Sequence, residues 1–320
     1  MSKISVALAA YRGEKFIGRQ VESLLRQTRI PDEIVITDDS PDELTREALT
    51  PFLSDPRIRY VRNPERLGVN ANFENAIARC TGDIIFLCDQ DDVWLPEKIR
   101  IMAAGLENDP AADGIFCDSE VVDETLSPLG YSLWQMREFS RGMRRRLAAG
   151  DALGVFFKRV TLSTHNIAIR SRVLPWIMPY PELDPFYSDT WIALRVASQG
   201  RWAMADEKLT LYRVHGDNLS APKKAGLAEQ ARRSRSRTAK YSFRRTAELA
   251  EELIRRLPDS ADPDVRAALE MFRRHYAVRL GYPDNMLLRS GCIMREILTG
   301  RYGRFSNGWK SAAADLLLFR

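Results

Sequence analysis

The sequence predicts an α/β protein with an open, mainly parallel sheet covered by helices on both faces, followed by a helical C-terminal region. Three observations predict this fold. Strand-like apolar segments alternate with segments of helical apolar spacing through the first 120 residues. Polar residues follow directly after several strand candidates. After residue 218 the pattern is helical and basic to the end of the chain.

The strand candidates of the first part are short apolar runs, at residues 4–10, 33–37, 58–61, 84–88 and 114–118. Two intervening segments place apolar residues on one helical face, namely Ile17, Val21, Leu24 and Leu25, and then Val69, Phe73, Ile77 and Cys80. The order is therefore strand, helix, strand, repeated along the chain.

The second part is less regular. Residues 127–158, with their basic stretch 141–146, are compatible with a mobile loop or a substrate-facing helix. Residues 162–169 and 209–214 again have the pattern of strands, and residues 189–198 between them predict a helix.

The composition is that of an ordinary globular protein, with 320 residues, 45% hydrophobic and 28% charged. No basic-then-apolar leader precedes the first strand, and no apolar window has the length of a transmembrane helix. We therefore expect a cytoplasmic protein. The four cysteines have no paired spacing, which indicates neither a zinc site nor disulfides.

Charge is distributed unevenly. Residues 1–215 hold 27 Lys and Arg against 31 Asp and Glu, whereas residues 216–320 hold 21 against 12. The densest basic run consists of Arg232, Arg233, Arg235, Arg237, Lys240, Arg244 and Arg245. It suits an anionic partner such as a phosphorylated lipid, a membrane surface or nucleic acid, and it equally suits a solvated helix face.

An acidic block after residues 84–88 is the most informative motif. Asp89, Asp91 and Asp92 follow a fully apolar strand candidate within four positions. Carboxylates this close repel one another unless a cation or hydrogen-bond donors occupy the site, so a hard divalent ion is a natural counterpart. The alternative is an acidic turn that caps the helix opened by Pro96.

Other polar groups converge on the same edge of the predicted sheet. Ligands of open α/β sheets bind beyond the carboxyl ends of the strands. Tyr11, the pair Asp38 and Asp39, and the acidic block all follow strand ends.

Taken in order, these landmarks resemble the family 2 glycosyltransferases of GT-A fold, which is Rossmann-like, and among them the bacterial rhamnosyltransferase-like enzymes of cell-surface polysaccharide synthesis. The resemblance covers about residues 3–216. It rests on the segments 10–14, 23–27, 38–39, 66–68, 82–83, 89–94, 188–191 and 212–218. It implies a catalytic domain over residues 1–216 and a basic helical region over 217–320.

The family implies a nucleotide-sugar donor. By resemblance, Tyr11 packs on the pyrimidine base and Asp38 accepts a hydrogen bond from its ring N–H. The other residues that the resemblance assigns to the donor are Ala10, Asp39, Arg66, Asp89, Gln90 and Asp92. Ser40-Pro41 stands where the family usually continues with glycine and serine.

The family also implies a metal and a base. Asp91, Asp89 and His215 would hold Mg²⁺ or Mn²⁺, which bridges the diphosphate. Asp189 would take the proton of the acceptor hydroxyl in an inverting transfer, although Ser188-Asp189 is also good helix-capping chemistry. His165 and Trp191 would line the acceptor or sugar pocket. His275, in a basic helix, is expected at the surface.

The favoured function is transfer of a sugar from a dTDP- or UDP-linked donor, rhamnose being the family favourite, to a saccharide or lipid-diphosphate-linked acceptor. The alternatives are a sugar-nucleotide nucleotidyltransferase, which would need a glycine-rich loop after the first strand, and a nucleic-acid-binding protein. We expect no nucleic-acid partner. The end of the chain, 316–319 after Trp309 and Lys310, fits a peripheral anchor at the inner face of the cell membrane, core packing or an oligomer contact.

Overall fold

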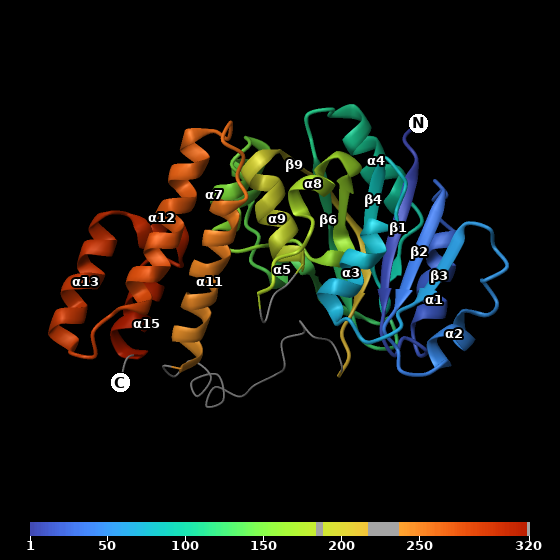
Figure 1. The fold of residues 1–320 in the computed structure, drawn as a ribbon, viewed down its shortest axis with the longest axis horizontal. Coiled ribbons are helices and arrows are strands. Elements are labelled where there is room, and N and C mark those ends of the chain that lie inside the picture. The colour runs from blue at the N-terminus through green and yellow to red at the C-terminus, as the bar shows by residue number, and fades with distance from the viewer. Residues whose placement is uncertain (184–187, 217–236, 319–320) are drawn as a thin grey trace. The chain divides into compact units, whose positions relative to one another are not determined.

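A computed structural model describes residues 1–183, 188–216 and 237–318 of the chain. At residues 237–240 and 318 it describes the backbone alone. The described chain divides into two compact units (Figure 1). The first holds most of residues 1–216. The second holds the C-terminal helices and also takes in residues 153–160 and 181–183. Within the part described, no helix is long and apolar enough to cross a membrane.

The first unit is built on one mixed sheet with the order β3-β2-β1-β4-β8-β6-β9-β5, and β7 pairs with β6. Its strands are β1 Ile4–Ala10, β2 Glu33–Asp38, β3 Ile58–Arg62, β4 Ile84–Asp89, β5 Val93–Trp94, β6 Gly114–Val122, β7 Pro128–Ser132, β8 Ile167–Arg170 and β9 Trp202–Arg213. Strands β3, β2, β1 and β4 are parallel. Strand β8 is antiparallel to both of its neighbours.

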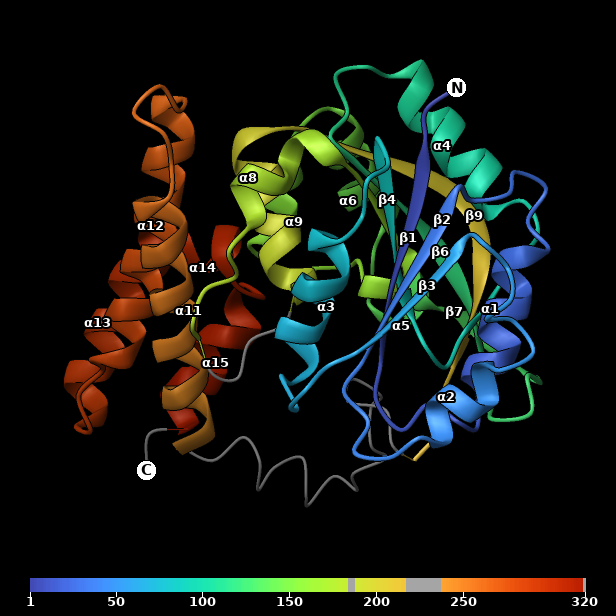
Figure 2. The same cartoon turned by 45° about the vertical axis from the view of Figure 1, so that its right-hand side comes forward.

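Helices cover both faces of this sheet, as the sequence predicts (Figure 2). The helices of this unit are α1 Ile17–Leu25, α2 Leu44–Leu49, α3 Val69–Ala78, α4 Lys98–Asn108, α5 Leu133–Met136, α6 Arg141–Ala148, α8 Leu174–Ile177 and α9 Ser188–Gln199, with short 3₁₀ turns at Thr164–Asn166 and Ser171–Val173. The stretch 141–146, which the sequence left undecided, is therefore helical. Helix α7, Ala152–Phe156, belongs almost entirely to the second unit.

The core of the first unit lies mainly on one face of the sheet. Alternate residues of β1 and β4, such as Leu8 and Phe86, pack against apolar residues of α1 and α4, such as Val21 and Met102, and all four are fully buried. On the other face, α3 sits over β1 and β2, where Thr37 donates a hydrogen bond to the Asn72 carbonyl. Both faces of these parallel strands are covered, so their carboxyl ends are the places left for a ligand.

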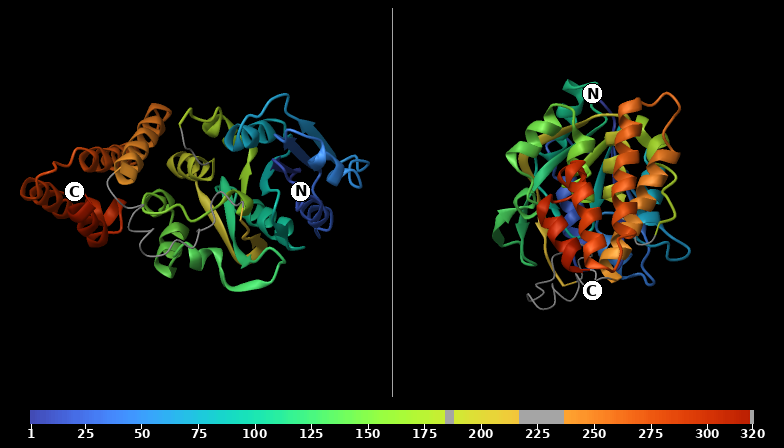
Figure 3. Two further views of the ribbon diagram at one scale, coloured as in Figure 1. Left: turned by 90° about the horizontal axis from the view of Figure 1, so that it is seen from below. Right: turned by 90° about the vertical axis from the view of Figure 1, so that its left-hand side faces the viewer.

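The second unit is helical, with α11 Arg237–Arg255, α12 Pro263–Leu280, α13 Met286–Leu298, α14 Arg301–Phe305 and α15 Trp309–Leu318 (Figure 3). Phe272 of α12 stacks on Phe157 at 4.4 Å between ring centroids. Arg232, Arg233 and Arg235 of the basic run lie outside the described residues.

The prediction for His275 was wrong. Its side chain is fully buried, with Nδ1 2.9 Å from Glu296 Oε2 and Nε2 2.9 Å from Ser306 Oγ. Burial and the nearby Arg279 lower the pKa of His275 to about 3. The arginines that flank His275 in sequence suggested a surface helix, but they do not decide which face of α12 packs.

Candidate active site

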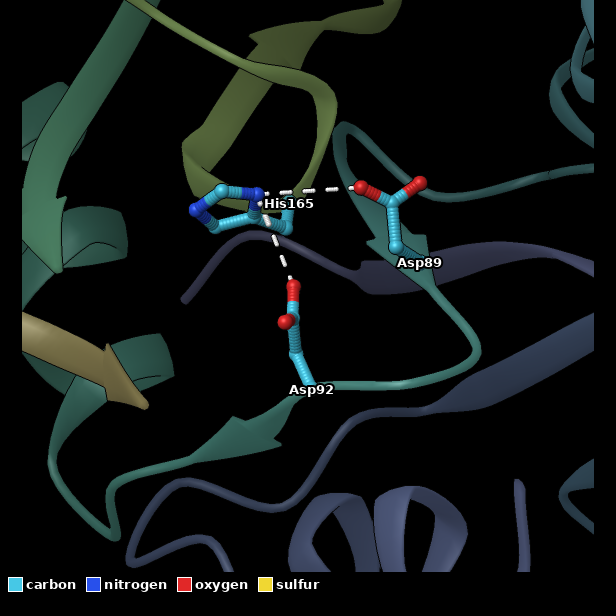
Figure 4. A group of neighbouring side chains, drawn as sticks. All are labelled: Asp89, Asp92 and His165. Carbon is cyan, nitrogen blue, oxygen red and sulfur yellow. Dashed lines mark ion pairs between the residues drawn. The ribbon is translucent and has the colours of Figure 1, made fainter. Parts of the chain in front are cut away.

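The acidic block lies at the carboxyl end of β4, where that strand pairs with β1. Asp89 closes β4, and residues 90–92 form the turn to the short strand β5. Asp89, Asp92 and His165 meet here, with their donor atoms within 4.8 Å of one another (Figure 4). His165 Nδ1 is 3.7 Å from Asp89 Oδ2 and 3.5 Å from Asp92 Oδ2.

Negative charge in this group is poorly compensated by hydrogen bonds. Asp92 is fully buried and its Oδ1 accepts a hydrogen bond from the Arg213 backbone N–H at 3.0 Å, whereas Oδ2 is buried with no hydrogen-bond partner in the described chain. Burial first, and then the charge of Asp91, raises the pKa of both Asp89 and Asp92. A cation at this position would relieve both effects.

His165 is positioned by the 3₁₀ turn Thr164–Asn166 that precedes β8. Its ring stacks on Tyr212 at 4.7 Å between centroids, and its Nε2 lies 3.1 Å from Ser119 Oγ. Burial lowers the pKa of His165 to about 3, and the positive charge of Lys98 acts in the same direction. The imidazole is therefore neutral at physiological pH, which is the form that binds metal ions.

Asp91 and His215 form a second, more open group. His215 Nε2 lies 2.9 Å from Asp91 Oδ2, and the side chains are 8% and 18% exposed respectively. The Phe16 ring packs beside His215 at 4.8 Å between centroids. The predicted ligands thus lie in two adjacent groups, because Asp89 belongs with Asp92 and His165. Which of them bind a metal stays a prediction.

Lys98 is the site residue that sequence reasoning missed. It is fully buried, donates hydrogen bonds to Thr210 Oγ1 at 2.8 Å and to the His165 carbonyl, and lies 3.8 Å from the centroid of Trp94. Burial lowers its pKa, while neighbouring groups that include Asp92 and Asp89 act in the opposite direction. Its one signal in the sequence was position, since it shares the buried face of α4 with Met102 four residues on.

The β1–α1 loop lies next to the acidic block, because β1 pairs with β4. Tyr11 is half-buried, and the Arg66 guanidinium lies 4.3 Å from its ring centroid. The Gln90 amide clamps the Tyr11 backbone, accepting from its N–H and donating to its carbonyl, both at 2.9 Å. Gln90 therefore positions the Tyr11 loop, and its predicted contact with the donor stays a prediction.

Asp38 and Asp39 are buried at the end of β2 and are engaged inside the protein. Asp38 accepts hydrogen bonds from the Tyr60 hydroxyl at 2.7 Å and the Ser40 N–H at 2.9 Å. Asp39 holds the loop before α3, through the Gly68 N–H at 2.8 Å. The Ala10 carbonyl accepts from Asn72. These bonds shape the loops beside Tyr11, and contacts of Ala10, Asp38 and Asp39 with a nucleotide remain predictions.

Asp189 lies in the first turn of α9, which begins at Ser188, one residue before the predicted start. Its Oδ1 accepts hydrogen bonds from the Thr190 N–H at 2.5 Å and the Thr190 hydroxyl at 3.2 Å. Burial raises the pKa of Asp189, Arg137 and the Thr190 bonds oppose this rise, and the charge of Asp89 adds to it. A carboxylate with a raised pKa accepts a proton more readily than an ordinary aspartate.

Trp191 does not fit the place predicted for it. It is fully buried, and its indole N–H donates to the Ile177 carbonyl at 2.7 Å. Trp191 therefore anchors α9 to α8, because the side chain two residues after Asp189 points into the protein. No surface of it is open to a sugar in this structure.

The family model "Glycosyl transferase family 2" matches residues 5–157, which contain β1 to β4 and the acidic block. This part of the chain is a family 2 glycosyltransferase domain. The glycosyltransferase also resembles an uncharacterized glycosyltransferase of Nostoc, with 23% identity over 283 residues that cover 87% of this chain and 83% of the relative. An uncharacterized protein of Mycobacterium tuberculosis is 24% identical over 225 residues, and the match spans 60% of that protein.

Solved structures share the GT-A fold of the glycosyltransferase. S. aureus TarS in complex with UDP-GlcNAc superposes with a TM-score of 0.60 at 15% identity, covering 99% of this chain and 89% of that one. The mannosyltransferase PcManGT of Pyrobaculum calidifontis, in complex with GDP-Man and Mn²⁺, gives 0.58 at 16% identity, covering 99% and 86%. The predicted fold is confirmed.

Proposed function

We propose that the protein is a metal-assisted, inverting glycosyltransferase that transfers a sugar from a nucleoside diphosphate to a saccharide or lipid-linked acceptor in cell-surface polysaccharide synthesis. The observation that carries the proposal is the gathering of Asp89, Asp91 and Asp92 with two histidines at one end of β4. The Arg66 guanidinium lies over the ring of Tyr11, whose backbone is held by Gln90 of this block. The charge of Asp89 in the block also raises the pKa of Asp189.

The donor set fits a divalent metal. Carboxylate oxygens and neutral imidazole suit Mn²⁺, and carboxylates suit Mg²⁺. The buried Oδ2 of Asp92, which has no hydrogen-bond partner in the described chain, carries charge that a nearby cation would offset. A bound metal would neutralise charge on the departing diphosphate. We assign it to Asp91, His215 and Asp89, because Asp91 and His215 keep exposed surface that a diphosphate could reach, whereas the Asp92–His165 pair is sealed from solvent.

Asp189 is the proposed base. As the acceptor oxygen attacks the anomeric carbon, its O–H bond breaks and the Asp189 carboxylate takes the proton. The bond from the anomeric carbon to the diphosphate oxygen breaks, and its electron pair leaves with the nucleoside diphosphate. Attack from the face opposite the leaving group inverts the anomeric configuration, and a second carboxylate nucleophile is not needed. Tyr11 and Arg66 offer flat surfaces for the base of the donor.

Similarity to other glycosyltransferases supports a proposal for the donor and the acceptor. We propose a dTDP- or UDP-linked donor, with rhamnose as first candidate sugar, because TarS binds UDP-GlcNAc and the sequence resembles rhamnosyltransferases. An E. coli glucosyltransferase named for a UDP-Glc donor and a diphosphoundecaprenol-linked GlcNAc acceptor is 29% identical over 98 residues, 31% of this chain and 38% of that protein. It supports a lipid-diphosphate acceptor here.

A thermal-shift screen tests the donor proposal. Nucleoside diphosphates and their sugars, each with Mn²⁺, Mg²⁺ or a chelator, should include at least one pair that raises the melting temperature, because a ligand of the native state stabilises it by mass action. The absence of a shift with every nucleotide and metal would contradict the proposal.

Paired substitutions test the metal assignment. Asp91→Asn should weaken Mn²⁺ binding, measured by calorimetry, by about tenfold or more, because a charged ligand is lost. Asp42→Asn, at an exposed aspartate of the same unit, is the matched control and should bind as the unaltered protein does. If Asp92→Asn weakens binding and Asp91→Asn does not, the ion belongs to the Asp89, Asp92 and His165 group instead.

A further inference from the structure

The second unit contains a helix whose polar and apolar faces are reversed relative to an ordinary surface helix. The side of α13 that packs into the protein carries Arg289 and Glu296, both 2% exposed. The opposite side carries Leu287 at 82%, Met294 at 54% and Leu298 at 80% exposure. These three side chains are seven and four residues apart, which places them on one stripe of a helix with 3.6 residues per turn.

The burial of charge in α13 is specific. Glu296 Oε2 lies 2.9 Å from His275 Nδ1, and its Oε1 pairs with Arg301. The Arg289 guanidinium donates to the backbone carbonyls of Pro283 and Leu316. The polar side of α13 is therefore fixed inside the unit, so the helix cannot turn its leucines inward without breaking these bonds.

The apolar stripe is not isolated. Leu288 and Met286 at the start of α13 are 65% and 54% exposed, and Ile297 at its end is 42% exposed. In the neighbouring helix α15, Trp309 and Leu317 are 75% and 70% exposed. Large apolar side chains exposed along two short helices indicate a surface that binds a partner or a membrane.

The charges of this part of the chain indicate the partner. Between Met286 and Leu317, where every residue is described, the two acidic residues Glu296 and Asp315 are buried and form ion pairs with Arg301 and Arg279. The exposed charges are Arg295, Arg304 and Lys310, and none of them has an ion pair within the described chain. Apart from the exposed Asp284, two residues before Met286, the exposed charges of this part of the chain are positive, which matches an anionic lipid surface.

A second copy of the chain is a weaker match. A two-fold interface over this stripe would bring the same arginines of both copies together, with no exposed carboxylate in the segment to pair with them. At 13 residues α13 is about 20 Å long, which suits a helix lying in the plane of a bilayer surface.

We propose that the Leu287, Met294 and Leu298 stripe of α13 is a membrane-docking surface that inserts into an anionic bilayer, with Arg295, Arg304 and Lys310 contacting lipid phosphates. The site lies within the helical unit and uses no residue of the acidic block. It does not rest on the proposed function, because vesicle binding needs no sugar donor.

Vesicle flotation of the full chain tests this surface. The protein should float with vesicles of phosphatidylcholine plus phosphatidylglycerol and much less with phosphatidylcholine alone. Leu287→Ser with Leu298→Ser should lower the partition by about tenfold or more, because two leucines leave the bilayer. Leu44→Ser with Leu129→Ser, at half-exposed leucines of the first unit, is the matched control and should leave binding unchanged.

A second variant separates charge from apolar insertion. Arg295→Gln, Arg304→Gln and Lys310→Gln together should abolish the preference for anionic vesicles and reduce the salt sensitivity of binding. Circular dichroism should show the same helix content in all variants, because every altered side chain is exposed.

The proposal is overturned if the unaltered chain does not float, or if the leucine variant floats equally well. A concentration-dependent oligomer that only the leucine variant loses, without vesicle binding, would assign the stripe to a second copy.

Discussion

Asp189, the proposed base, lies in an environment that disfavours its charged form. Burial raises its pKa, so the folded state resists its ionisation. A raised pKa in the folded state favours the protonated form there, and stability is lost as pH rises from the unfolded pKa through the folded one. At neutral pH the charge of Asp189 therefore destabilises the protein, which is compatible with its proposed role as the base.

Asp189→Asn should separate the two effects. We expect kcat to fall by about 10²-fold or more, because the base is lost, while donor binding survives. The melting temperature at neutral pH should not fall, because the amide oxygen can keep the Thr190 bonds and the buried charge is gone. Unchanged turnover would remove Asp189 as the base, and a large drop in melting temperature would show that its charge stabilises the fold.

Single residues differ in how well their sequence reveals them. Asp91 and Asp189 could be proposed as site residues because each stands close to the end or start of a regular element with a clear pattern, and their roles stay predictions. Lys98 could not, since a lysine at the start of a helix is usually solvated and its burial here depends on tertiary packing, including that of α4 against β9. Trp191 was misplaced because sequence proximity to Asp189 does not reveal which way a side chain points on a helix.

At the scale of elements, local patterns located the parallel strands well. Strand β1 is confirmed at both ends, and β2 and β4 extend one residue beyond their predicted ends. The prediction of one strand over 162–169 was partly wrong, because Asn166 Oδ1 accepts the Ser163 N–H at 2.9 Å and closes a 3₁₀ turn before β8. The insertion of β8 between β4 and β6 depends on contacts far apart in the chain, which no local pattern encodes.

The β1–α1 loop depends on a glycine. A Cβ at Gly13 would lie 2.4 Å from Gln90 Oε1, the atom that accepts the Tyr11 N–H. Gly13→Ala should therefore displace the Gln90 clamp and loosen the Tyr11 loop. We expect donor KM to rise about tenfold, with stability falling by about 1 to 3 kcal/mol, because the added methyl overpacks a close contact.

Gly142→Ala, in helix α6 of the same unit, is the matched control, since a Cβ there meets only Ser140 Oγ, at 3.7 Å. Steady-state kinetics and urea unfolding of both variants measure the two effects. If Gly13→Ala leaves donor KM unaltered, the Gln90 clamp does not control the nucleotide side of the site.

For the whole molecule, the acidic block links stability to pH and to metal. The pKa values of Asp89 and Asp92 are raised by burial and by the charge of Asp91. Between the unfolded and folded pKa values the native state binds more protons than the unfolded state, so metal-free stability should fall as pH rises through this window.

A divalent ion should replace those protons. The increase in melting temperature on adding Mn²⁺ should therefore be larger at pH 7.5 than at pH 5, because at pH 5 protons already neutralise the block and compete with the ion. Calorimetric melting with Mn²⁺ or a chelator at both values measures this difference. Asp89→Asn with Asp92→Asn should flatten the pH dependence of the chelated protein, since the two raised carboxyls are gone. An equal Mn²⁺ shift at both pH values would mean that the ion binds away from the block, and the metal would then have no place in sugar transfer here.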